Sequence, residues 1–218
     1  MYNQSMNQPS KPHKTAKPDK SGLLLDAAYA LFLERGDTDI SIREIADRAG
    51  VAKGTFYLYF RDKDDLKETL IAQKSNEFFQ HAIAALHATD IASFDDQIIF
   101  VINYLINELA ANQMALRLIA KNLSLGVFNR KVQDYLVDDQ SDIVRSLLSA
   151  AKRSGIRLQN PRILLFMIIE LTSSTCFSCI LEERPLPIEE YKPYLFATIR
   201  QMIHDATAKT RNHCEDMV

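Results

Sequence analysis

Two cysteines three positions apart are the first candidates for chemistry in this chain of 218 residues. Cys176 and Cys179 form a C-x-x-C motif, a spacing typical of thiol redox switches and of metal sites. Redox motifs of this kind normally open a helix beside a strand, and a metal site needs further ligands. The pair instead lies within an apolar stretch that predicts a buried helix. We therefore favour two core cysteines and keep a thiol switch as the distant alternative.

The other titratable groups form no catalytic or metal-binding pattern in the sequence. His81, His87 and His204 are isolated, and none stands near acids or cysteines at ligand spacing. The sequence also contains no phosphate-binding glycine loop and no nucleophile elbow. We therefore expect no enzymatic activity, no metal and no cofactor.

A second group of residues, between Ser41 and Lys63, has side chains suited to double-stranded DNA. An arginine can present a bidentate fork to guanine, and a threonine methyl can contact thymine. Tyrosine hydroxyls and lysine ammonium groups suit phosphates, and a glycine lets the backbone approach closely. The alternative for the tyrosines is a surface or core role without DNA. The predicted DNA-binding residues are Ser41, Arg43, Lys53, Gly54, Thr55, Tyr57, Tyr59 and Lys63.

Two short helices around a tight turn must position these side chains. Ser41 and Glu44 have the spacing of a capping box, which begins the first helix. Gly50 ends it, and a second helix is predicted over about 52–60. Phe56 and Phe60 can pack back onto the first helix and leave the polar side chains outside. This pattern is typical of a helix-turn-helix, whose second helix can enter a major groove.

Residues from about Leu24 to Leu66 resemble the DNA-binding domain of the tetracycline-repressor (TetR) family of bacterial transcription regulators. The matching segments are LLLDAAYALFLERG, ISIREIADRAG, VAKGTFYLYF and RDKDDL, in the order and spacing of the family. The resemblance implies phosphate contacts mainly at Ser41, Tyr57 and Lys63. One departure is Ala52, which stands where the family usually has a small hydroxyl N-cap, so this helix lacks a side-chain acceptor worth ~1 kcal/mol.

The rest of the chain keeps helical periodicity, so we predict an all-α protein of about nine helices. The N-terminal part is a three-helix helix-turn-helix domain, and the C-terminal part is a helical ligand-binding and dimerisation domain. Residues 1–20 carry spaced lysines and prolines and are either a solvated tail or a basic arm that reaches along DNA. The predicted units are 1–20 (disordered arm), 21–66 (DNA-binding domain), 67–208 (effector-binding and dimerisation domain) and 209–218 (flexible tail).

The last two long helices are the predicted dimer surface. The stretch 161–181 is apolar nearly all round, which indicates burial on more than one side, and a second helix follows over 188–208. The first approaches membrane-spanning length, but Glu170 and several hydroxyl residues favour a protein–protein helix, so no membrane association is expected. A homodimer also follows from the TetR resemblance, because one head contacts only a few base pairs.

The resemblance further implies a small-molecule pocket in the helical body. Glu170 is the polar candidate, because an acid within an apolar helix is costly unless it is paired. It could attract a cationic ligand, pair with an arginine across the dimer, or face water. Ordinary core packing is the alternative for each apolar candidate. The predicted effector-binding residues are Phe100, Tyr104, Met114, Phe128, Tyr135, Phe166, Met167, Glu170 and Phe177.

Composition is consistent with a globular protein that contacts DNA locally. Hydrophobic residues make up 47% and charged residues 25%, and the formal net charge is −2. Without a global excess of basic residues, DNA contacts must depend on local placement of charge. Three cysteines make no disulfide framework and no secretory signal opens the chain, so a reducing cytoplasm is expected.

Together these features favour a transcriptional regulator, a repressor that binds a palindromic operator as a homodimer and is released by a small-molecule effector. Ligand binding is expected to displace the helix predicted over about 62–86 and so change the separation of the two heads. The alternative is a DNA-binding protein of the same architecture that acts without an effector, as an architectural or partner-controlled factor.

Overall fold

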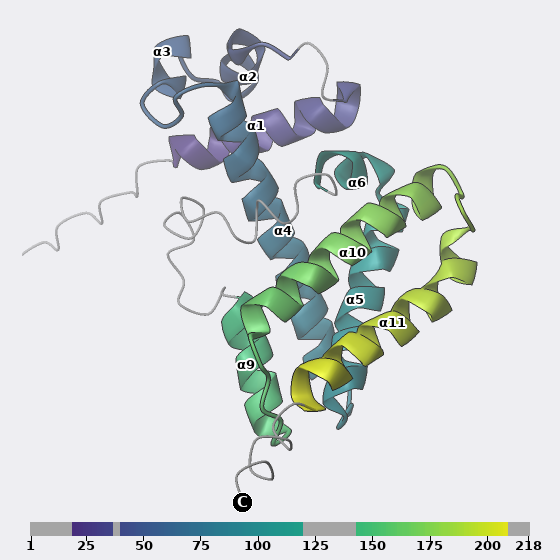
Figure 1. Ribbon diagram of the computed structural model, residues 1–218. Helices are drawn as coiled ribbons and strands as arrows, with labels where there is room; N and C mark the ends of the chain where they lie inside the picture. Colours follow the sequence, from purple (N-terminus) through teal and green to yellow (C-terminus); the bar gives the residue numbers. More distant parts are fainter. Residues whose placement is uncertain (1–18, 37–39, 120–142, 209–218) are drawn as a thin grey trace, which may run out of the picture.

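The structure, a computed structural model, describes residues 19–36, 40–119 and 143–208. Within these ranges the chain forms helices and no strand, which confirms the all-α prediction. Helices α1 to α3 lie at one end of the molecule, and α4 runs from them into the body (Figure 1). The helices are α1 (Lys20–Arg35), α2 (Ile42–Arg48), α3 (Lys53–Phe56), α4 (Lys63–His87), α5 (Phe94–Ala111), α6 (Gln113–Ile119), α9 (Ile143–Arg153), α10 (Pro161–Leu181) and α11 (Ile188–Ala208).

Helices α1 to α3 and the first turns of α4 form a head built on buried apolar side chains. The first helix presents an apolar stripe to this core, with Leu24 and Ala28 fully buried. Phe56 and Phe60 come from the second half of the helix-turn-helix and are 0% and 2% exposed. Burial of two phenylalanines by so short a segment fixes its path, because each ring removes a large apolar area from water.

Local signals define the ends of the head helices. The Ser41 hydroxyl accepts a hydrogen bond from the Glu44 amide (3.2 Å), and the Glu44 carboxylate accepts one from the Ser41 amide (2.9 Å). This is the predicted capping box. Gly36 and Gly50 follow α1 and α2 with φ of 76° and 67°, a left-handed backbone that glycine adopts without steric cost.

The second helix of the pair is shorter than predicted. The sequence indicated a helix over about 52–60, whereas α3 spans only Lys53–Phe56 and a turn follows it. The Leu58 amide donates to the Thr55 carbonyl (3.2 Å) and the Tyr59 amide to the Phe56 carbonyl (3.0 Å). These bonds span three residues rather than four and tighten the chain away from α-helical geometry. Gly54 and the absence of a side-chain cap at Ala52 leave α3 with little intrinsic helix stability.

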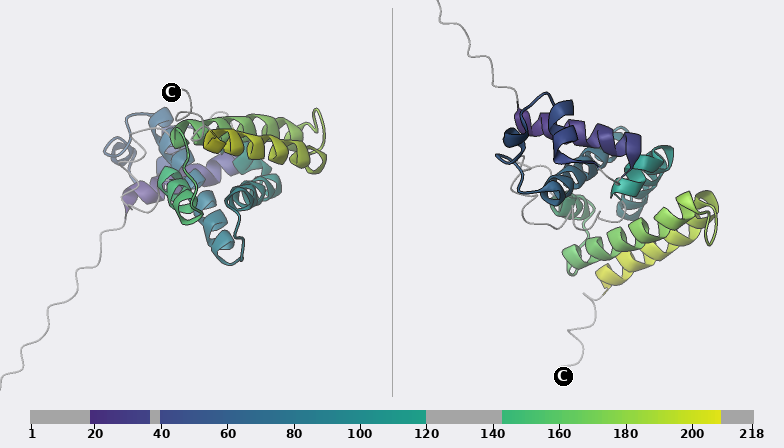
Figure 2. Two further views of the ribbon diagram at one scale, coloured as in Figure 1. Left: turned by 60° about the horizontal axis from the view of Figure 1, so that its bottom comes forward. Right: turned by 90° about the horizontal axis from the view of Figure 1, so that it is seen from above.

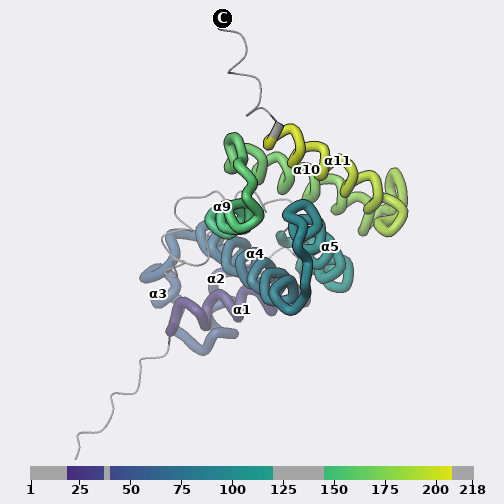
Figure 3. Tube along the Cα trace, turned by 90° about the horizontal axis from the view of Figure 1, so that it is seen from below, coloured from purple at the N-terminus to yellow at the C-terminus, as the bar shows by residue number. Residues whose placement is uncertain are grey.

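Helices α4 and α6 join the head to the body. Leu70 and Ile71 of α4 belong to the core of the head, and so do Leu118 and Ile119 of α6. The core of the head therefore extends past residue 66, where the sequence placed the domain boundary. A second core lies in the body and joins α5, α9, α10 and α11. Figures 1 and 3 show α5 and α9 on either side of the C-terminal half of α4, with α10 across them.

The later helices begin and end close to the predicted residues. Pro161 is the first residue of α10, as predicted, although Asn160 before it adopts a left-handed backbone (φ 46°) and caps no amide with its side chain. Helix α6 ends at Ile119 and α9 begins at Ile143, and the residues 120–142 between them lie outside the described residues. The predicted effector residues Phe128 and Tyr135 lie outside the described residues.

Candidate nucleic-acid interface and ligand cavity

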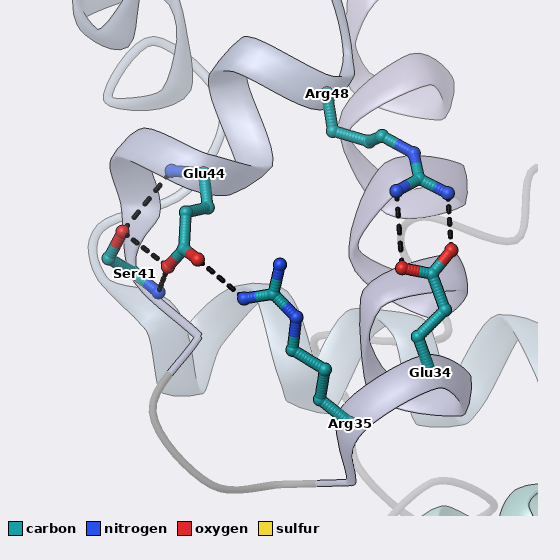
Figure 4. A network of polar contacts seen from close by, with 5 residues as sticks. All are labelled: Glu34, Arg35, Ser41, Glu44 and Arg48. Carbon is teal, nitrogen blue, oxygen red and sulfur yellow. Dashed lines mark hydrogen bonds and ion pairs between the residues drawn. The ribbon is translucent and has the colours of Figure 1, made fainter.

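Ion pairs between α1 and α2 brace the head. Arg35 donates to the Glu44 carboxylate (Nη1–Oε1 2.6 Å), and Arg48 makes a two-pronged pair with Glu34 (Figure 4). The Ser41 backbone amide, and after it Arg35, lowers the pKa of Glu44 from 4.5 to about 2. Arg35 and Arg48 are therefore engaged within the head.

The α2 residues predicted to contact DNA are exposed. Ser41 lies at the exposed start of the helix, and the Arg43 side chain is 81% exposed. The Arg43 Nε lies 3.7 Å from the Asp47 carboxylate, whose own side chain is 71% exposed. An exposed pair at this spacing contributes little, about 0.3–0.5 kcal/mol. Arg43 can therefore leave Asp47 for a base edge at small cost.

The α3 segment presents both polar and apolar groups to solvent. Lys53 and Gly54 are exposed, whereas Thr55 is half-buried. Tyr57 is 53% exposed and its ring packs edge-on against Phe56, with the centroids 5.4 Å apart. Tyr59 is 38% exposed. The edge-on contact with buried Phe56 thus packs one side of the Tyr57 ring while the side chain stays exposed to solvent.

Leu58 is a surface residue that the sequence analysis did not select. It lies between the two exposed tyrosines and is 78% exposed, more than the other exposed large hydrophobic side chains of the described residues. A leucine kept in water by a rigid turn is suited to an apolar partner, and the thymine methyl group is the apolar feature of a major groove. The sequence did contain a signal for Leu58, because it is an aliphatic residue in a segment whose other side chains are either polar or needed in the core.

Lys63 begins α4 beside acidic side chains. It is half-buried, and the Asp62 carboxylate accepts a hydrogen bond from the Asp65 amide (2.8 Å). Free amides at a helix start would add to the attraction of an anion. One of those amides is already bonded to a carboxylate, so the Lys63 ammonium is the main attractive group at this point.

A cavity of about 630 Å³ lies in the body, within the usual size range of small-molecule sites. Helices α4, α5, α6, α9 and α10 contribute its lining. The wall formed by α5 is almost entirely apolar and includes Val101, Ile102 and Leu105. The cavity lies directly below the head, because the α6 residues Leu116 and Ile119 also line it.

The cavity is lined by residues other than those predicted. None of Phe100, Tyr104, Met114, Phe166, Met167, Glu170 and Phe177 belongs to its lining.

Helical geometry accounts for this difference between the predicted effector residues and the lining of the cavity. On α10 the cavity is lined by Leu165, Ile168 and Thr172, and a rotation of 100° per residue places Phe166 and Met167 on another face. These two side chains are 46% and 48% exposed. The same argument separates Phe100 and Tyr104 from the cavity-facing residues of α5. Large aromatic side chains were therefore a poor guide to the cavity.

The two cysteines of α10 are buried, at 4% exposure for Cys176 and 1% for Cys179. Burial raises the pKa of Cys176 from 9.0 to about 12 and also raises the pKa of Cys179. A thiol that resists ionisation is a poor nucleophile and a poor metal ligand. Among the described residues no group of three His, Cys, Asp or Glu side chains could hold a metal ion. These features favour the core interpretation of the pair.

Comparison with known proteins bears on the helix-turn-helix first. Residues 24–70 match the family described as bacterial regulatory proteins, tetR family. These residues, which form the head, match the helix-turn-helix domain of this family. Over 57 residues it is 39% identical to the fatty acid metabolism regulator protein of Bacillus subtilis (strain 168), a match that spans 26% of this chain and 29% of that protein. Over 175 residues it is 27% identical to an HTH-type transcriptional regulator of Staphylococcus aureus (strain bovine RF122 / ET3-1), covering 78% of this chain and 86% of the relative. The matched head and the relative that aligns over most of the chain support a DNA-binding transcriptional regulator.

Solved structures share the fold of most of the chain. The fatty acid degradation regulator FadR from Bacillus halodurans superposes with a TM-score of 0.57 at 22% identity, over 85% of this chain and 96% of that one. FadR from Bacillus subtilis in complex with stearoyl-CoA gives a TM-score of 0.55 at 21% identity, over 84% and 99%. At these identities the likeness extends to the arrangement of helices in both head and body.

Helix α10 is long and apolar enough to cross a membrane by length and composition, the one such helix among the described residues. Its inner face, with Leu164, Leu165 and Ile168, is packed in the body core. Only 28% of the apolar window is buried within the single chain, so much of its surface faces outward.

Proposed function

We propose that the chain is a homodimeric repressor that binds a palindromic operator through its two heads and is released when a small molecule occupies the body cavity. The main support is that helix α6 contributes side chains both to the core of the head and to the lining of the cavity. Ile119 of α6 is 1% exposed, belongs to the core of the head and also lines the cavity. A ligand that displaces this side chain must also disturb the packing of the head.

Further contacts support coupling between body and head. The α1 residue Tyr29 lies under the Lys74 ammonium of α4, 4.7 Å from the ring centroid. Burial raises the pKa of Tyr29, whose hydroxyl also hydrogen-bonds with the side chain of Asn112. Asn112 in turn accepts a hydrogen bond from the Ala115 amide at the start of α6 (3.0 Å). Movement of α4 or α6 would therefore be transmitted to α1.

The outer faces of α10 and α11 support a dimer. The two helices lie side by side at the edge of the molecule (Figure 2). Ile163, Phe166 and Met167 of α10 are 57%, 46% and 48% exposed, and Tyr194 of α11 is 65% exposed. A second copy of this face would remove these side chains from water, and a pair of heads would read two half-sites.

Ligand and operator would act through different preferred states of the same body. If the ligand prefers an arrangement of α4 and α6 that DNA disfavours, the ligand weakens DNA binding and DNA weakens ligand binding. The coupling free energy is the same in both directions, typically ~1–3 kcal/mol. The FadR structure with stearoyl-CoA supports the view that this fold can hold a ligand. The alternative, an effector-independent or partner-controlled DNA-binding protein, would leave the cavity without a regulatory role.

Selection of bound sequences from random duplex DNA with the full chain tests the proposal. We expect an inverted repeat bound by two chains, and an operator affinity that falls in the presence of one class of metabolite. A single half-site bound by one chain would refute the dimer, which light scattering measures independently. An operator affinity that no metabolite alters would favour the alternative.

A further inference from the structure

We propose that the body cavity takes an elongated uncharged molecule whose oxygen acceptor stands between two apolar segments and receives a hydrogen bond from Thr172 of α10. A long-chain ketone and an ester of similar length share this chemistry. An effector role for such a molecule rests on the proposed function, whereas its binding is a property of the cavity alone.

The cavity is bounded by two long walls. On α4 its lining runs from Ser75 to His87, and on α5 from Gln97 to Leu109, which is about 18 Å of helix axis in each case. Residues 88–93 join the two helices, which run in opposite directions and pack against each other (Figure 1). The walls therefore face the same space over the same length. A volume of about 630 Å³ spread along these walls suits a slender molecule better than a rounded one.

The interior of the cavity is uncharged. Its basic lining residues, His87, Arg145 and Arg153, are all exposed. Arg145 is also already engaged in an interaction within the chain. Among the lining residues that the structure describes, none is aspartate or glutamate. A charge carried into this interior would lose its hydration without gaining a partner, so the buried length of the ligand should be neutral.

Thr172 supplies a polar group to this interior. Its hydroxyl is buried and has no hydrogen-bond partner among the described residues. The hydroxyl groups of Ser75 and Thr175 donate instead to the carbonyl group four residues back, at 2.6 Å in both cases. Thr172 makes no such bond with its own helix. Because buried hydroxyl groups are normally bonded, this one is available to donate to a ligand oxygen.

The position of Thr172 places that oxygen in the middle of the ligand. The α10 lining extends from Leu165 to Ile180, and Thr172 lies near its centre, with about 10–12 Å of helix axis on either side. Ile168 and Ile169 are apolar lining residues one turn before it. A terminal head group would instead meet one end of the cavity. The inferred ligand is therefore apolar on both sides of its oxygen, which separates it from an amphiphile with a charged end.

Positional isomers of one ketone test the site. Pentadecan-8-one has its carbonyl group at the centre of the chain and pentadecan-2-one has it near one end, while their apolar areas are nearly equal. Isothermal titration of the full chain with these ketones, supplied as cyclodextrin complexes, should show about fivefold tighter binding of the central isomer. This ratio is equivalent to ~1 kcal/mol, the usual net contribution of one hydrogen bond.

Two further probes define the class. Heptyl octanoate, an ester of the same carbon number, shows by its affinity whether a ketone or an ester is preferred. Pentadecanoate carries the same number of carbons with a terminal charge and should bind more weakly than pentadecan-8-one. Tighter binding of pentadecanoate or of pentadecan-2-one, or no binding of either central carbonyl compound, would overturn the proposal.

The variant Thr172→Val keeps the branched shape of the side chain and removes the hydroxyl group. It should weaken binding of pentadecan-8-one about fivefold and leave pentadecan-2-one unchanged. Thr175→Val is the matched control, because Thr175 lies on the same helix outside the lining and its hydroxyl is bonded to the Leu171 carbonyl. A preference for the central isomer that survives in Thr172→Val, or that is lost equally in the control, would contradict the assignment.

Thermal melts of the free variants add a readout that does not depend on the ligand. Thr172→Val should be at least as stable as the wild type, because it removes a buried hydroxyl group without a partner. A clear loss of stability would mean that the hydroxyl group serves the fold rather than a ligand.

Operator binding is measured separately, so the two proposals can fail independently. If pentadecan-8-one binds through Thr172 but leaves operator affinity unchanged, the site stands and the effector role falls. If another molecule occupies the cavity and releases the operator while neither central carbonyl compound binds, this inference falls and the proposed regulator stands.

Discussion

The missing N-cap of α3 makes a quantitative test of the recognition segment. Ala52 occupies the N-cap position with φ −66° and ψ 145°, the extended backbone that a capping residue needs, and it is exposed. Its carbonyl already accepts a hydrogen bond from the Thr55 amide (2.8 Å), but no side chain serves the Gly54 amide. Ala52→Ser should place a hydroxyl within reach of that amide without any change of backbone.

The hydroxyl should stabilise the folded α3 by ~1 kcal/mol, which is the usual contribution of an N-cap side chain. A helix of four residues is marginal by itself, so the gain should appear first as local order in α3. If α3 must be ordered to bind DNA, operator affinity should rise by up to about fivefold, the same ~1 kcal/mol expressed as a ratio. A global effect would raise Tm by about 2–4 °C for a chain of this size.

Amide hydrogen exchange of Gly54 and Thr55, thermal denaturation and operator titration measure these three effects. Ala88→Ser is the control, because Ala88 is an exposed C-cap at the end of α4, where a hydroxyl has no free amide to accept from. If exchange at Gly54 and Thr55 does not slow in Ala52→Ser, or if the control changes it equally, the reasoning about the cap is wrong.

Four substitutions test the head, and one labelling experiment tests the thiol pair. Arg43→Ala should cost ~1–3 kcal/mol of operator affinity and relax preference at one base pair, whereas Lys63→Ala should weaken binding to all sequences alike. Affinities for a library of operator variants separate the two effects. A base-selective loss in Lys63→Ala would contradict its phosphate role. Leu58→Ser should reduce discrimination between thymine and uracil at one position, because only thymine carries the methyl group; equal losses on both would exclude that contact. The pKa of Glu44 is lowered to about 2, so its stabilising contribution is complete above pH 4.5 and is lost as the pH falls towards 2. The free energies of unfolding of the wild type and of Glu44→Gln, measured in urea, should therefore converge near pH 2. A difference that stays constant with pH would refute the pairing. Because the pKa of Cys176 is about 12, its alkylation in the native protein should stay slow at pH 9 and accelerate on unfolding, and rapid native labelling would reopen the thiol switch.

Local interactions made much of the fold predictable. The capping box of Ser41 and Glu44 and the positive-φ glycines Gly36 and Gly50 act within a few residues, so their consequences follow from neighbouring side chains alone. The first residue of α10 follows from Pro161 in the same way. The length of α3 was less predictable, because the burial of Phe56 and Phe60 against α1 and α4 outweighs the helical preference of the residues between them.

The amino-acid sequence alone determined the helical class, the helix-turn-helix and its exposed polar residues, because these depend on spacing and on short-range bonds. Only the tertiary structure decided which faces line the cavity. Helix α10 is apolar nearly all round, so its composition contains no contrast by which an inward face could be recognised. Its orientation is set by packing against α5, α9 and α11, which are distant in the chain.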